Sequence, residues 1–147
     1  MATLWPILTL IHLLGLGLAV GAAAVKLTLL LRGRADAAAI PAYLAVAAPV
    51  TRLIVVGIAL ATLSGIGFLA LGRPLTPILI AKLGLVAAMW VLGPIIDRAV
   101  EPRFARLAPS PGSPASPGFA RAQGQHLALE VLATSLLCAI AVLGVLI

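Results

Sequence analysis

The chain has 147 residues, of which 63% are hydrophobic and only 10% are charged. A soluble domain carries about 25% charged residues, so this composition is typical of a protein that lipid solvates. The formal charge of +6 comes mostly from arginines beside apolar runs, a membrane-topology pattern that argues against nucleic-acid binding. The single cysteine, Cys138, excludes an internal disulfide and a cysteine-based metal cluster.

Four apolar runs are long enough to cross a ~30 Å hydrocarbon core as helices. They cover residues 5–31, 49–71, 76–97 and 126–147. A barrel would alternate polar and apolar residues, whereas these runs are continuous. We therefore predict one all-α domain over the whole chain, an integral membrane four-helix bundle in the lipid bilayer. No basic residue precedes the first run, so we expect it to be retained rather than cleaved as a signal peptide.

The segments around these runs carry helix and loop signals. Pro6 lies near the start of the first run, and Thr76 with Pro77 supplies an N-cap and a first-turn proline for the third. The short apolar piece 40–48, which contains Pro41, extends the second helix ahead of its span. The connection 99–125 contains LAPSPGSPASPG, which predicts a flexible tether.

Basic residues in the connections predict the orientation. One side of the predicted membrane receives Arg32, Arg34, Arg98, Arg103, Arg106 and Arg121, and the other receives only Arg73. The positive-inside rule then places the first and third connections in the cytoplasm and both termini outside, in the inner (cytoplasmic) membrane.

Charged groups within a span cost at least about 2.5–3.5 kcal/mol each at its centre, so each one requires a reason. His12, six residues after Pro6, and Lys82, five residues after Pro77, lie at matching depths of roughly 7–9 Å from the same surface. We expect these two side chains to face each other.

A second layer of charge lies near the opposite surface. Lys26, Arg52 and Glu130 each fall within a few residues of that end of their spans and are predicted to form a structural charge cluster. His126 precedes Glu130 by four residues and shares its helix face. Snorkelling of Lys26 and Arg52 to the interface is the alternative explanation for the two basic residues.

Small residues follow His12 along the first run. Gly15 shares the face of His12, and Gly17 with Gly21 forms a GxxxG pair on an adjoining face. Small residues let another helix or a flat ligand approach the backbone closely. The GxxxG face therefore predicts contacts with membrane-protein partners or a homo-oligomer.

Two short stretches resemble a known group of proteins. IHLLGLGLAVG at residues 11–21 and AKLGLVAAMW at residues 81–90 resemble the copper-resistance-D-like small bacterial membrane proteins, which are similar to the J-type protoporphyrinogen oxidases. In those oxidases, a first-span histidine and a lysine near the start of a later span are associated with haem or porphyrin. The resemblance implies that His12 and Lys82 bind haem b or a porphyrin.

Three functions follow as hypotheses. In the first, His12 is the axial metal ligand of a haem-type cofactor, and Lys82 pairs with a propionate. In the second, the chain is a structural accessory subunit of a larger membrane complex. A small-ion transporter ranks last, because the centre near Ala19 and Leu60 looks dry. Soluble-type catalysis is disfavoured: there is no Ser/His/Asp set, no paired carboxylates and no phosphate loop. No catalytic residue is assigned, and whether the chain is an enzyme stays open.

Overall fold

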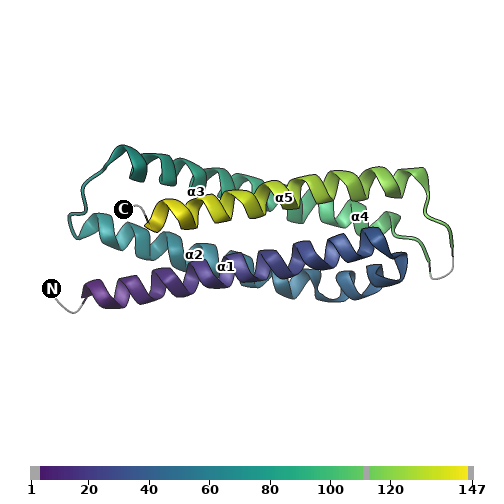
Figure 1. The fold of residues 1–147 in the computed structure, drawn as a ribbon, viewed down its shortest axis with the longest axis horizontal. Coiled ribbons are helices and arrows are strands. Elements are labelled where there is room, and N and C mark those ends of the chain that lie inside the picture. Colours follow the sequence, from purple (N-terminus) through teal and green to yellow (C-terminus); the bar gives the residue numbers. More distant parts are fainter. Residues whose placement is uncertain (1–3, 111–112, 146–147) are drawn as a thin grey trace.

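The computed structural model describes residues 4–110 and 113–145, and within them it is all-α (Figure 1). Four continuous helical segments in the described part are long and apolar enough to cross a membrane. The first and last are single helices, α1 (Leu4–Ala35) and α5 (Pro117–Val145). The second joins η1 (Ala37–Ala39) to α2 (Ile40–Ala70), and the third joins α3 (Pro77–Ile95), η2 (Ile96–Val100) and α4 (Glu101–Leu107). The four-helix prediction is therefore confirmed.

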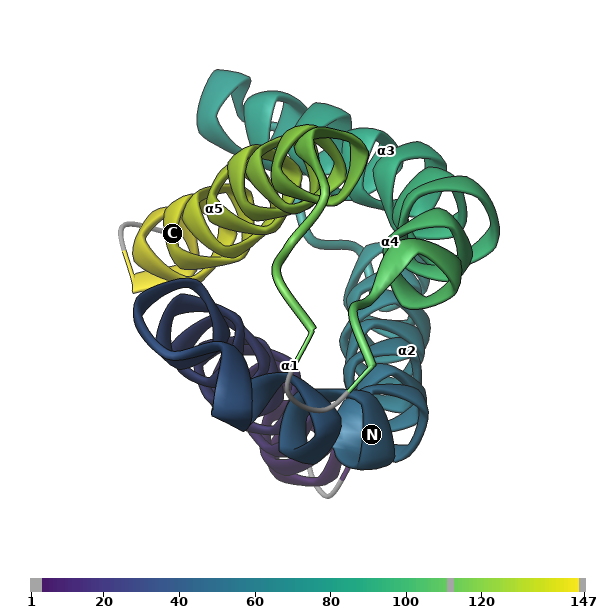
Figure 2. The same cartoon turned by 90° about the vertical axis from the view of Figure 1, so that its right-hand side faces the viewer.

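Viewed along the bundle, the four segments follow one another in the order α1, α2, α3, α5 (Figure 2). α1 packs closely on α2 and also on α5, and α3 packs on α5. α2 and α3 are neighbours with little direct backbone contact, so a seam runs between them. The cavities described below lie beside this loosely packed seam.

α1 and α2 cross at two glycines. A Cβ atom on Gly15 would lie 2.7 Å from the Ala61 backbone nitrogen, and one on Gly57 would lie 2.6 Å from the Ala19 backbone nitrogen. Each helix thus presents a glycine and an alanine four residues apart, and the two backbones meet where larger side chains would clash. The crossing holds the polar residues of the two helices in fixed register on either side of it.

The expected helix starts are present. Thr76 caps α3, because its hydroxyl accepts a hydrogen bond of 3.2 Å from the Leu79 amide, and Pro77 occupies the first turn. α2 begins at Ile40 with Pro41 in its first turn and continues through Pro49. The second helix therefore extends ahead of its span.

The third connection is more helical than its composition predicts. The flexible tether was expected over residues 99–125, but helix continues to Leu107 and resumes at Pro117. Within that tether, residues 111–112 lie outside the described residues, as do 146–147 of the fourth predicted span. Phe104 and Phe119 explain the difference, because their rings are buried with centroids 5.2 Å apart and give both flanks an apolar face.

Candidate functional site

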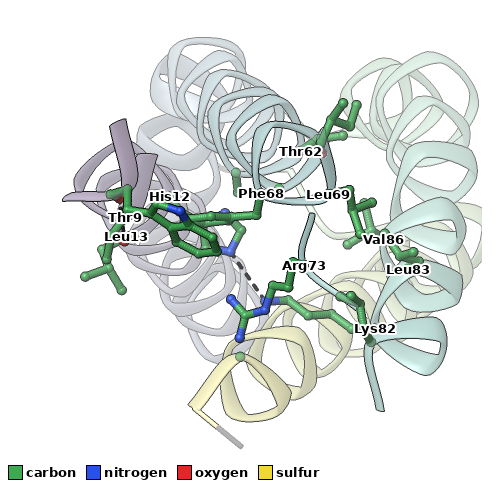
Figure 3. Close-up of a pocket in the computed structure, with 16 residues that line it drawn as sticks. Thr9, His12, Leu13, Thr62, Phe68, Leu69, Arg73, Lys82, Leu83 and Val86 are labelled. Atoms are coloured by element: carbon green, nitrogen blue, oxygen red, sulfur yellow. Dashed lines mark hydrogen bonds between the residues drawn. The ribbon is translucent and has the colours of Figure 1, made fainter. Parts of the chain in front are cut away.

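His12 and Lys82 lie together, as their matched depths predict. The Lys82 Nζ is 3.4 Å from the His12 Nε2 (Figure 3). The His12 Nδ1 is 2.9 Å from the Ser64 Oγ. An ammonium group only donates hydrogen bonds, so Nε2 accepts and Nδ1 carries the imidazole hydrogen. The Ser64 hydroxyl then donates to the Leu60 carbonyl at 2.7 Å. This relay, together with Arg73, is called the His12 site below.

The His12 site lines a cavity of about 220 Å³. The walls come mainly from α1, α2 and α3, with Arg73 from the turn after α2 and Gly144 from α5, and they are largely apolar. The Phe68 ring packs against both Trp5 and His12. Lys82 and Arg73 are the two cations of the lining, and none of the four acidic residues of the chain contributes to it. The cavity thus combines an apolar body with two positive charges that have no carboxylate beside them among residues 4–110 and 113–145.

Lys82 lies against the last turn of α5. A Cβ atom on Gly144 would be only 2.9 Å from the Lys82 Nζ, so the absence of a side chain there makes room for the ammonium. The C-terminal end of a helix carries partial negative charge, which favours a nearby cation. Lys82 is therefore held by a helix end and an imidazole rather than by an ion pair among the described residues.

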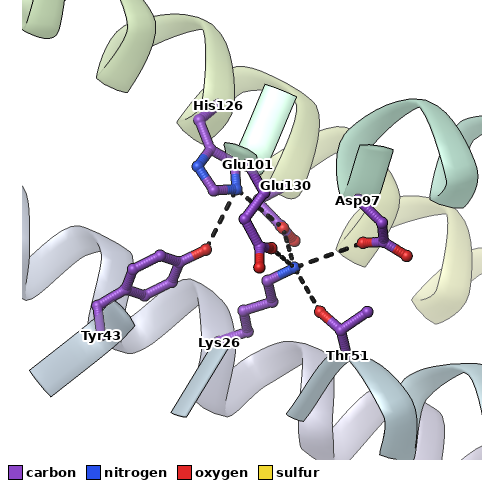
Figure 4. A network of polar contacts seen from close by, with 7 residues as sticks. All are labelled: Lys26, Tyr43, Thr51, Asp97, Glu101, His126 and Glu130. Atoms are coloured by element: carbon purple, nitrogen blue, oxygen red, sulfur yellow. Dashed lines mark hydrogen bonds and ion pairs between the residues drawn. The ribbon is translucent and has the colours of Figure 1, made fainter. Parts of the chain in front are cut away.

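A second polar group surrounds Lys26 on the other side of the glycine crossing (Figure 4). The Lys26 Nζ lies 2.6 Å from Glu101 Oε2, 2.9 Å from Glu130 Oε1 and 3.8 Å from Asp97 Oδ1. It also donates to the Thr51 hydroxyl at 2.8 Å. Lys26 is only 2% exposed, so three of the four carboxylates of the chain gather around one buried cation. We call these residues the Lys26 cluster.

The π-helical turn η2 brings two of these carboxylates inward. Pro94 has no amide hydrogen, which breaks the α-helical pattern just before the turn. Within η2 the hydrogen bonds span five residues, and the Glu101 amide donates to the Ile96 carbonyl. The wider turn places Asp97 and Glu101, four residues apart, on the side that faces Lys26.

Tyr43 and His126 extend the Lys26 cluster into a buried aromatic group. The His126 Nε2 lies 3.3 Å from Glu130 Oε1 and 3.2 Å from the Tyr43 hydroxyl. Phe104 packs against both rings, with centroids 5.2 Å from His126 and 5.6 Å from Tyr43. Because both His126 and Tyr43 are buried, this end of the bundle is fixed by packing as well as by charge.

Glu101, His126 and Glu130 offer ligand atoms within 4.8 Å of one another, a spacing that suits a metal ion. The Lys26 ammonium already contacts both glutamates of this group. A resident cation therefore fills the position where a metal would bind, and we treat the group as a lysine-centred cluster.

The structure brings most of the predicted site residues together. His12 meets Lys82, and Lys26 meets Glu130. Arg52 lies exposed on α2 and makes no ion pair among the described residues, whereas its neighbour Thr51 contacts Lys26.

Sequence reasoning missed other members of both groups, although some of them had a weak signal. Tyr43 is the only tyrosine of the chain, and Asp97 and Glu101 follow a proline at the end of an apolar run. Ser64 and Arg73 had no such signal. They reach the His12 site only because α2 and the turn after it pack beside α1 and α3.

Comparisons with known proteins do not add a family. No protein-family model, curated protein or solved structure matches this chain. The resemblance to the copper-resistance-D-like group therefore stays a prediction based on two short stretches, and function has to be argued from the two sites.

The His12 site fits the predicted binding of haem propionates better than the predicted ligation of haem iron. Lys82 and Arg73 provide cations for propionates. However, both His12 ring nitrogens have hydrogen-bond partners, so axial ligation requires Lys82 to leave Nε2. The cavity of about 220 Å³ is also below the roughly 300–1,000 Å³ of typical ligand pockets. The geometry therefore favours anion recognition over iron ligation.

Proposed function

We propose that this chain is a multi-pass membrane protein whose His12 site binds an apolar molecule that carries a carboxylate. The observation that carries this proposal is the pair of cations, Lys82 and Arg73, in an apolar cavity to which no acidic residue contributes. Lys82 and Arg73 are half-buried, and a charge partly withdrawn from solvent gains from an anionic partner, which a ligand carboxylate would supply. His12 holds one face of the Lys82 ammonium and leaves its other hydrogens for the ligand.

The distribution of arginines supports the proposed orientation. Arg32 and Arg34 end α1, and Arg103 and Arg106 lie in α4, at the end of the bundle that holds the Lys26 cluster (Figure 1). Arg73 lies alone in the turn at the opposite end. The positive-inside rule then places the Lys26 cluster on the cytoplasmic side and the His12 site on the outer side of the inner membrane.

Haem b or another porphyrin is the candidate ligand that the sequence resemblance supplies. Its propionates match Lys82 and Arg73, and its apolar ring suits walls that include Trp5 and Phe68. When bound, haem would supply redox or ligand-binding chemistry at its iron. The residues of this chain would bind the carboxylates and exclude water from the ring.

The test compares haem with metal-free protoporphyrin on purified protein, by absorbance and fluorescence titration. Anion recognition predicts that both ligands bind, and that Lys82→Met weakens both at least tenfold, whereas His12→Ala weakens them less. Binding of haem alone, abolished by His12→Ala, would instead indicate axial ligation. The proposal fails if neither porphyrins nor long-chain carboxylates bind in a manner that depends on Lys82.

A structural accessory subunit is the second candidate, and one observation favours it. Gly17 and Gly21 are exposed on α1, and a Cβ atom on either would meet open space. The GxxxG pair is thus left unused by the described part of the bundle and is free to receive another helix. Co-purification of a stoichiometric partner, lost in Gly17→Leu but kept in Lys82→Met, would support this role.

A further inference from the structure

Three cavities lie end to end inside the bundle, where α2 and α3 make little direct contact. The cavity of the His12 site measures about 220 Å³, and a second cavity of about 230 Å³ adjoins the Lys26 cluster. A small cavity of about 30 Å³ lies between them. It shares His12 and Lys82 with the first, and Ile58, Met89 and Leu137 with the second.

The inner part of this row is apolar along most of its length. The second cavity is lined by aliphatic side chains, Met89 and Trp90 until it reaches Lys26 and its carboxylates. Trp90 donates a hydrogen bond of 3.2 Å from Nε1 to the Thr62 hydroxyl, which bridges α3 and α2 between the two large cavities. The small cavity lies on the interior side of this hydrogen bond and connects the two large cavities there.

We infer that the three cavities form one slot for a single-chain anionic amphiphile, with its head at Lys82 and Arg73 and its chain passing behind Trp90. This rests on the proposed function, since the same two cations hold the anionic group. The small cavity holds only about 30 Å³, too little volume for a ring, whereas an unbranched chain needs room there for only a short stretch of its length.

Length and charge both agree with this occupant. His12 and Lys26 are 14 residues apart on α1, or about 21 Å, which exceeds the ~15 Å that one leaflet contributes to the hydrocarbon core. A membrane-length chain therefore fits. The far end carries two cations, Lys26 and Arg98, but also Asp97 and Glu130, whose carboxylates offset that positive charge. Only the end at Lys82 and Arg73 therefore favours an anionic group, so the ligand has one charged head and an apolar tail.

The two tryptophans of the chain report on the two ends of the slot. Trp5 lines the first cavity and Trp90 the second. The experiment uses protein in bilayer nanodiscs and the variants Trp90→Phe and Trp5→Phe, each of which leaves one tryptophan. Hexadecanoate brominated beside the carboxylate should quench Trp5, and hexadecanoate brominated at the methyl end should quench Trp90. Both signals should saturate and should weaken at least tenfold in Lys82→Met.

Ordinary partitioning into the bilayer would also place bromine near each tryptophan, so blocking the small cavity supplies the decisive comparison. Ile58→Phe fills the shared wall of the small and second cavities, and Leu53→Phe adds the same ring on the exposed side of α2. Ile58→Phe should abolish saturable quenching of Trp90 by the end-labelled chain and spare quenching of Trp5 by the head-labelled chain, which also shows that the variant folds. Leu53→Phe should change neither.

Two other results would separate the inference from the proposed function. Unchanged quenching of Trp90 in Ile58→Phe would overturn the slot, while Lys82-dependent quenching of Trp5 would keep the anion site. Absence of saturable quenching in both single-tryptophan variants would overturn the slot, and porphyrin binding would then decide the proposed function. Competition by unlabelled hexadecanoate, against hexadecyl phosphate, identifies which anionic head the site prefers.

Discussion

The His12 site and the Lys26 cluster each centre on a lysine, but carboxylates surround the lysine in only one of them. Each lies between α1 and its neighbours, and each has a lysine as its central cation. At the Lys26 cluster, three carboxylates and Thr51 satisfy the lysine. At the His12 site, Lys82 meets only a neutral imidazole and a helix end, with Arg73 nearby. One lysine is compensated by the chain itself, and the other is left for something else to compensate.

This difference separates a residue that contributes to the fold from one that we propose binds a ligand. A compensated buried charge is expensive to remove, because its partners are left behind without it. An uncompensated charge costs the fold little when removed, and it is the better candidate for binding. Substitution of Lys26 should therefore lower mainly the stability of the fold, and substitution of Lys82 should lower mainly the affinity for a ligand.

The largest expected effect is on stability at the Lys26 cluster. Lys26→Met leaves the buried carboxylates of Glu101 and Glu130 without their cation and should lower the free energy of unfolding by about 3–5 kcal/mol. Denaturant titration in mild detergent or bicelles measures this loss. Arg52→Met is the matched control, since Arg52 is an exposed cation on α2 without an ion pair among the described residues, and it should stay within about 0.5 kcal/mol of the wild type.

A small effect of Lys26→Met would mean that the surrounding carboxylates are protonated and need no cation. The double variant Lys26→Met/Glu130→Gln distinguishes these cases. If the charges are paired, the double variant should recover part of the stability that the single variant loses, because one uncompensated carboxylate is gone.

The next effect concerns the crossing that holds both sites in register. Gly15→Ala places a Cβ atom 2.7 Å from the backbone of α2 and should cost about 1–3 kcal/mol through overpacking. Gly17→Ala adds the same atom in open space, where it should be neutral or stabilising because alanine favours helix. Unfolding measurements on the pair test the crossing. Equal effects of the two substitutions would show that α1 and α2 do not approach at Gly15.

The sequence was sufficient for the fold because continuous apolar runs leave one solution in a membrane. The same continuity hid details that depend on packing. The Pro- and Gly-rich composition near residue 110 predicts a loop, yet Phe104 and Phe119 find partners and keep the flanking segments helical. Gly15, which shares a face with His12, turns out to hold the helix crossing, while the more conspicuous pair at Gly17 and Gly21 stays exposed.

The candidate sites were predictable to the extent that depth determines contact. Counting residues from helix ends places His12 opposite Lys82 and Lys26 near Glu130. Counting cannot give the rotation of a helix, so it selects Arg52 where the structure uses Thr51, one residue and about 100° away. The inward turn of Asp97 and Glu101 depends on the π-turn after Pro94, which composition does not reveal.

A smaller effect compares the hydroxyl groups that hold the two histidines. Ser64→Ala removes the side-chain partner of the His12 Nδ1 hydrogen, while Lys82 occupies Nε2, and should cost about 1 kcal/mol. Tyr43→Phe leaves His126 Nε2 its contact with Glu130 and should cost about half as much, roughly 0.5 kcal/mol. The same unfolding assay ranks them. The reverse order would show that the Tyr43 hydroxyl contributes more at His126 than the Ser64 hydroxyl does at His12.

The smallest expected change in stability carries the most information about function. Lys82→Met removes a cation that no carboxylate compensates among the described residues. The substitution loses the attraction to the end of α5 but also relieves the repulsion from Arg73. The two effects should nearly cancel, and the free energy of unfolding should change by no more than about 0.5 kcal/mol. The same substitution should weaken carboxylate ligands at least tenfold. Stability measured without ligand and again with saturating ligand separates the two effects, because a ligand that binds only the folded state adds stability. A loss of several kcal/mol without ligand would instead make Lys82 a structural residue like Lys26, and the difference between the two sites would disappear.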